Sequence, residues 1–87
     1  MSVYVDPLVC YGGSRAFRWN TSCHMYADTE LELHIMAKKI GCQRWWFQDH
    51  ERLPHYDLVA SKRVLAIKYG AKEHTLKQMV KFMRKQT

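Results

Sequence analysis

The densest run of side chains that can do chemistry lies between Pro54 and Arg63. Pro54 has no backbone N–H and favours an extended conformation in the residue before it, so the chain is expected to be non-helical where it presents His55, Tyr56 and Asp57. An imidazole, a phenol and a carboxylate in succession can titrate or form hydrogen bonds. The stretch therefore predicts the edge of a polar pocket.

A helix is expected directly after this stretch, from about Ala60 to Tyr69, with Lys62 and Arg63 near its start. The free backbone N–H groups of a first helical turn favour an anion, and a guanidinium fork fits phosphate oxygens. The pair therefore forms a candidate phosphate site. The alternative, that both cations lie on a solvated helix face, stays open at this point.

A second group of cations follows the Gly12-Gly13 pair, where Arg15 and Arg18 alternate with aromatic residues. A glycine-rich loop that bears two arginines can close over an anionic ligand. However, the segment lacks the order of Gly, Lys and Ser or Thr that defines a P-loop, and an ordinary surface loop is the simpler explanation.

The elements that must position these residues alternate between β-rich and amphipathic runs. Capping boxes at Thr29/Glu32 and Thr75/Gln78 mark two further helix starts. Strands are expected at 3–5, 22–27, 43–48 and, as a short edge strand, 72–74, with 43–48 in the centre. The last helix should bury a stripe formed by Leu76, Met79, Val80 and Met83. The sequence thus predicts a single α/β domain over residues 1–87, with a small, largely parallel sheet of about four short strands and three helices.

In open α/β sheets, ligands bind beyond the carboxyl ends of the strands, and several polar residues follow the expected strand ends. In the predicted site, Lys62 and Arg63 hold a phosphate and Tyr56, placed in a loop, stacks on a ring. Polar edges of the ligand are read by His55, Asp57 and Gln48. The complete set of predicted ligand-binding residues is Asp6, Arg15, Arg18, His24, Gln48, His55, Tyr56, Asp57, Lys62 and Arg63.

Composition limits the classes of protein to consider. With 47% hydrophobic and 25% charged residues among 87, the chain is typical of a soluble globular domain, and no segment reaches the ~20 apolar residues of a membrane span. The N-terminus lacks the regions of a signal peptide, which predicts a cytoplasmic protein. A core of this size is marginal, which favours a homo-oligomer. Three cysteines at spacings that match no zinc motif predict neither a disulfide nor a metal site.

Three functions compete on these grounds. The net charge of +6 favours an anionic partner, and the first choice is a module that binds a phosphorylated, nucleotide-like small molecule without cofactor or turnover. The second is a small metal-dependent hydrolase or nuclease, with Asp6, Asp28 or Asp57 as ligands of a divalent ion. A nucleic-acid-binding protein ranks third, because no recognition helix or continuous basic groove is visible.

Several short motifs in a fixed order resemble a small family of bacterial and phage proteins, domain of unknown function 4031. These are Tyr4-Val5-Asp6-Pro7, Ser22-Cys23-His24-Met25-Tyr26-Ala27-Asp28, Glu32-Leu33-His34, Trp46-Phe47-Gln48, Pro54-His55-Tyr56-Asp57-Leu58, Lys62-Arg63 and Gly70-Ala71. The resemblance covers most of the chain. It departs from the family pattern at Val59-Ala60, where the family has a Thr-Pro helix start.

The family resemblance supplies no activity. It implies that the Ser-Cys-His, Trp-Phe-Gln and Pro-His-Tyr-Asp motifs share a polar site. A phage context implies a counter-defence protein that sequesters a nucleotide signal in the cytoplasm of its bacterial host, which is an argument by analogy.

Overall fold

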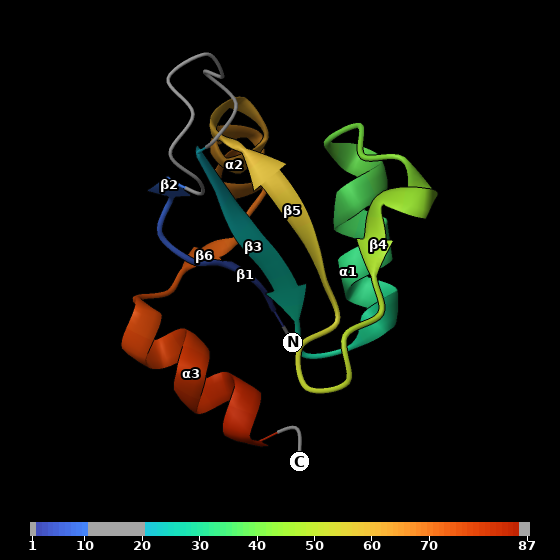
Figure 1. The fold of residues 1–87 in the computed structure, drawn as a ribbon. Coiled ribbons are helices and arrows are strands. Elements are labelled where there is room, and N and C mark those ends of the chain that lie inside the picture. Colours follow the sequence, from blue (N-terminus) through green and yellow to red (C-terminus); the bar gives the residue numbers. More distant parts are fainter. Residues whose placement is uncertain (1, 11–20, 86–87) are drawn as a thin grey trace.

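The computed structural model describes residues 2–10 and 21–85 of the chain. Its elements follow the sequence as β1 (Val3–Val5), β2 (Val9–Cys10), β3 (Thr21–Ala27), α1 (Glu30–Lys39), a 3₁₀ turn (Arg44–Trp46), β4 (Phe47–Gln48), β5 (His55–Val59), α2 (Ala60–Lys68), β6 (Lys72–Glu73) and α3 (Leu76–Lys85) (Figure 1). The predicted class, a small α/β domain with three helices, is confirmed. Arg15 and Arg18 lie outside the described residues.

The sheet is mixed, and the prediction of a largely parallel sheet with about four strands is wrong. Its strand order is β4-β5-β3-β1-β6, and β2 pairs with β3. Among these pairs only β1 and β6 are parallel. The reason is connectivity: β4 and β5 are joined by a loop without a crossover helix, and such a connection gives antiparallel neighbours.

The centre of the sheet is β3, not the segment 43–48 that was expected there. Within that segment, Arg44–Trp46 form a 3₁₀ turn and Phe47–Gln48 form a two-residue edge strand. Trp46 and Phe47 pack against the core, whereas the Trp45 side chain is 79% exposed. An aromatic run without alternating burial therefore does not form a central strand here.

Helices α1 and α2 cover one face of the sheet and enclose the core with it. The α1 start agrees with the predicted capping box: Thr29 Oγ1 accepts a 3.3 Å hydrogen bond from the Glu32 amide and donates one of 2.8 Å to its carboxylate. Gly41, with φ of +83°, ends this helix in the left-handed conformation that glycine tolerates. The predicted extent of α2 is confirmed to within a residue at its C-terminal end.

Helix α3 lies on the opposite face of the sheet, where Phe82 packs against Tyr4 and Tyr26 (Figure 1). Its predicted capping box is present, since the Gln78 amide donates to Thr75 Oγ1 at 3.1 Å. The predicted burial of its apolar stripe is wrong, because Leu76 is 51% and Val80 41% exposed. Among the described residues, no helix is long and apolar enough to cross a membrane.

Candidate functional site

The polar candidates lie on the face of the sheet that α1 and α2 leave uncovered. Along β3, Cys23 and Met25 point into the core, so His24 and Tyr26 point to the other face. Strand pairing places His24 directly opposite Asp57 of β5. Asp6, which follows β1, lies beside the other edge of β3, because its amide donates a hydrogen bond to the His24 carbonyl at 3.2 Å.

Asp6 holds the His24 side chain in one orientation. Its carboxylate accepts two hydrogen bonds from His24, one from the backbone amide and one from Nδ1, both of 2.7 Å. A carboxylate only accepts hydrogen bonds, so Nδ1 carries the proton and Nε2 is directed away from Asp6. This hydrogen bond raises the pKa of His24 above its ordinary value, while burial opposes the shift.

His55 is oriented in the same way by the backbone. Pro54 precedes it, and its Nδ1 donates a 2.6 Å hydrogen bond to the carbonyl of buried Leu53. Because a carbonyl cannot donate, this proton is again on Nδ1 and the lone pair is on Nε2. Burial lowers the pKa of His55 and therefore favours its neutral form.

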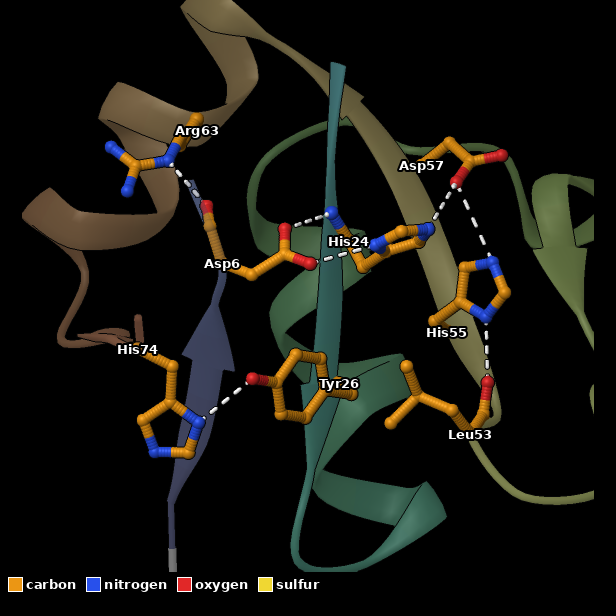
Figure 2. Close-up of polar contacts among 8 residues, drawn as sticks. All are labelled: Asp6, His24, Tyr26, Leu53, His55, Asp57, Arg63 and His74. Carbon is orange, nitrogen blue, oxygen red and sulfur yellow. Dashed lines mark hydrogen bonds and ion pairs between the residues drawn. The ribbon is translucent and has the colours of Figure 1, made fainter. Parts of the chain in front are cut away.

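Asp57 brings the two imidazoles together. Its Oδ1 lies 3.9 Å from Nε2 of His24 and 3.5 Å from Nε2 of His55, and the three atoms lie within 4.8 Å of one another (Figure 2). We call His24, His55 and Asp57 the triad. The Asp57 side chain is 52% exposed, so the triad is open to solvent on one side.

The triad has the donor set of a transition-metal site. Imidazole nitrogens suit Zn²⁺, Fe²⁺ and Ni²⁺, and two imidazoles with one carboxylate leave further coordination positions open. With metal–ligand bonds of about 2.05 Å, tetrahedral ligand atoms lie about 3.3 Å apart, so the triad atoms, which lie within 4.8 Å of one another, would move closer together on binding an ion. The outward hydrogen bonds from both Nδ1 atoms are the second shell that metal-binding histidines usually have.

The Arg63 side chain contacts Asp6 and Glu73 and is largely shielded from solvent. Its Nε donates to the Asp6 carbonyl at 3.0 Å, and its Nη2 lies 3.3 Å from a carboxylate oxygen of Glu73. Its side chain is only 16% exposed.

The buried Cys23 thiol beneath the triad has its pKa raised to about 12, mainly by burial. That thiol is therefore a poor nucleophile at neutral pH.

The structure brings some predicted site residues together and separates others. Asp6, His24, His55 and Asp57 form one cluster, with Arg63 behind it and Gln48 paired with His55 at the sheet edge. Tyr56, predicted in a loop, lies instead in β5, where its side chain is 1% exposed and its hydroxyl bonds to His34. Lys62 donates to the Ile40 carbonyl at 2.7 Å.

Two residues outside the predicted set also lie on this face. The Tyr26 hydroxyl and His74 Nδ1 form a 2.7 Å hydrogen bond beside the Asp6–His24 pair (Figure 2). Strict alternation along Thr21–Ala27 was the available signal, because it assigns Tyr26 to the same face as His24. Asp28, named as a possible metal ligand, binds instead the Tyr4 hydroxyl at 2.9 Å and the Ser2 amide at 2.8 Å.

The family comparison agrees with the motif resemblance in the sequence. Neither the curated proteins nor the solved structures include a match to this chain. A family model described as protein of unknown function (DUF4031) matches residues 3–86, which is nearly the whole chain. The chain therefore belongs to the DUF4031 family, whose function is not known.

Proposed function

We propose that this protein is a divalent-metal-dependent hydrolase that acts on a phosphorylated, nucleotide-like small molecule. The observation that carries the proposal is the triad: two Nε2 atoms and one carboxylate oxygen lie within 4.8 Å of one another, and each Nδ1 is hydrogen-bonded outward. An ion of the zinc class bound there supplies Lewis acidity and lowers the pKa of water.

The reaction needs only water as co-reactant. A water oxygen adds to phosphorus, the bond from phosphorus to the leaving oxygen breaks, and the water proton passes to the leaving group or to solvent. The three triad residues would hold the cation, and the half-exposed Asp57 side chain leaves it open to solvent on one side. Asp6 and the Leu53 carbonyl fix the two imidazoles in the tautomer that can bind it.

The net charge of the chain favours an anionic substrate. Lys and Arg number 14 against 8 Asp and Glu, which attracts phosphorylated molecules and speeds their encounter with the protein. Under this proposal, the counter-defence role implied by the family resemblance would be exerted by degrading a nucleotide signal.

Binding without turnover is the less favoured alternative. Two of the residues assigned to that role are engaged in the fold: the Lys62 ammonium binds a helix carbonyl, and the Tyr56 ring is buried. Neither is then available to a phosphate or a base. Nucleic-acid binding stays third, because nothing on this face of residues 2–10 and 21–85 favours a polymer over a small molecule.

The test is a turnover screen. Protein loaded with Zn²⁺ or Mn²⁺ is incubated with nucleotides, cyclic dinucleotides and ADP-ribose derivatives, and the recovered compounds are separated by chromatography. We expect a cleaved product that disappears on chelation and in a His55→Ala variant, and that persists in His34→Gln, which removes a histidine outside the triad. Recovery of every compound intact from the metal-loaded protein would contradict the proposal.

A further inference from the structure

A cavity of about 400 Å³ lies between β1 and α3, on the face of the sheet that α1 and α2 leave uncovered. Tyr4 and Phe82 form its aromatic wall, with ring centroids 5.4 Å apart. Lys81 and Lys85 lie one helical turn apart on α3 and both line the cavity. The cavity is therefore aromatic on one side and cationic on the other.

This cavity is next to the triad. Tyr26 follows His24 by two residues on the same face of β3, and its hydroxyl bonds to His74, which lines the cavity. Tyr4 lies opposite Tyr26 in the strand register. With strands about 4.8 Å apart and alternate residues about 6.7 Å apart along a strand, the triad and the cavity are separated by about 10 Å.

The charges in the cavity favour an anion. Among the described residues that line it, Asp28 is the one acidic residue, and its carboxylate already accepts hydrogen bonds from the Tyr4 hydroxyl and the Ser2 amide. The positive charges of Lys81 and Lys85 therefore outnumber the single negative charge of Asp28. Burial lowers the pKa of His74, so this residue adds no positive charge at neutral pH. Gln78 Oε1 accepts a 2.8 Å hydrogen bond from the Thr75 amide, so the Gln78 side chain can offer the cavity its NH₂ group as a donor beside the two lysines.

We propose that this cavity is the subsite for a second phosphate of the substrate, held by Lys81 and Lys85 while the first phosphate lies at the triad. The inference rests on the proposed function, because it takes the triad as the reacting end. It narrows the substrate class to a nucleotide with two phosphates separated by a nucleoside, such as a dinucleotide or a nucleoside bisphosphate.

Binding can be measured apart from turnover. The probes are adenosine 3′,5′-bisphosphate and adenosine 5′-monophosphate, titrated calorimetrically into metal-free protein. The double variant Lys81→Ala/Lys85→Ala is compared with Lys68→Ala/Lys77→Ala, which removes the same charge from exposed residues that do not line the cavity. In metal-free protein the triad has no cation to hold a phosphate, so both probes report on binding at the lysines. We expect the first variant to bind both about five- to tenfold more weakly and the second to bind both normally.

The inference is overturned if both double variants lose affinity equally, or if the bisphosphate does not bind at all. Because these titrations need no metal, they separate the two proposals. A chain that binds the bisphosphate through Lys81 and Lys85 but takes up no Zn²⁺ supports the subsite and refutes the hydrolase.

Discussion

The Asp6 carboxylate accepts two hydrogen bonds of 2.7 Å from a single residue, His24, and its side chain is 2% exposed. One of these bonds fixes the backbone pairing of β1 with β3 and the other fixes the imidazole tautomer. Under the proposed function, Asp6 therefore acts as a positioning residue: it orients His24, a ligand of the proposed metal ion, and does not face that ion itself.

Replacing Asp6 with Asn tests this role. The amide keeps the shape of the side chain but cannot accept both bonds, since one of its two polar atoms is an NH₂ donor. The His24 proton is then favoured on Nε2, where it blocks coordination. We expect Asp6→Asn to weaken Zn²⁺ binding by roughly 10- to 100-fold in calorimetric titration.

Asp49→Asn is the control for this loss of one negative charge, because Asp49 is exposed in the loop after β4. It should bind Zn²⁺ like the parent protein. Equal affinities of the parent and Asp6→Asn would show that Asp6 contributes only to the fold.

The Lys62 ammonium has a structural role that can be measured. It binds the Ile40 carbonyl at the end of α1, where the helix dipole is negative. Lys62→Met removes the charge but keeps most of the aliphatic chain. We expect a loss of about 1 kcal/mol in the free energy of unfolding, measured in urea, with nucleotide affinity unchanged. Lys68→Met, at an exposed position of α2, should change neither. If instead Lys62→Met loses affinity at full stability, Lys62 is a phosphate ligand after all.

His74 should make stability depend on pH. Burial lowers its pKa below the ordinary value of 6.5; Asp28 and Asp6 oppose the shift and Lys72 adds to it. Between the folded and unfolded pKa values the unfolded chain binds more protons, so this contribution is complete above pH 6.5 and is lost as pH falls below it. Gln in place of His can still bond Tyr26 but does not titrate.

The measurement compares urea unfolding of the parent and His74→Gln at pH 8 and pH 5. We expect the parent to lose more stability than the variant over this interval. His24 has the opposite shift, but it is present in both proteins and cancels in the comparison. An equal or larger loss in the variant would contradict the assignment.

The sequence predicted the helices well because their signals are local. The capping boxes at Thr29/Glu32 and Thr75/Gln78 both form, and Gly41 and Gly70 end helices with positive φ. Strand pairing is not local, and the sheet was wrong for that reason. Nothing within 43–48 shows that the segment turns before it reaches the sheet, or that β5 runs antiparallel to β3.

Four predicted site residues, Asp6, His24, His55 and Asp57, do cluster, but not for the expected reason. Asp6, His55 and Asp57 were expected after the carboxyl ends of parallel strands, whereas all four residues meet through cross-strand pairing on one face of an antiparallel region. Tyr56 faces the core because it alternates with His55 and Asp57. All three were expected in one loop, where no alternation applies, whereas in β5 only His55 and Asp57 share a face.

The homo-oligomer remains a prediction. The exposed Leu76 and Val80 side chains of α3 form an apolar surface at which two copies of the chain could associate. Multi-angle light scattering of the parent protein at micromolar concentration measures the oligomeric state. A monomer would contradict it.

The central claim is that His24, His55 and Asp57 bind one divalent ion. Calorimetric titration of Zn²⁺ into the parent, His55→Ala and His34→Gln proteins tests it most directly, because His34 is a histidine outside the triad that bonds to Glu30 and Tyr56. We expect one ion per chain for the parent and for His34→Gln, with affinity weakened roughly 100-fold or more in His55→Ala. Equal Zn²⁺ affinity in the parent and His55→Ala, or no uptake by the parent, would contradict it.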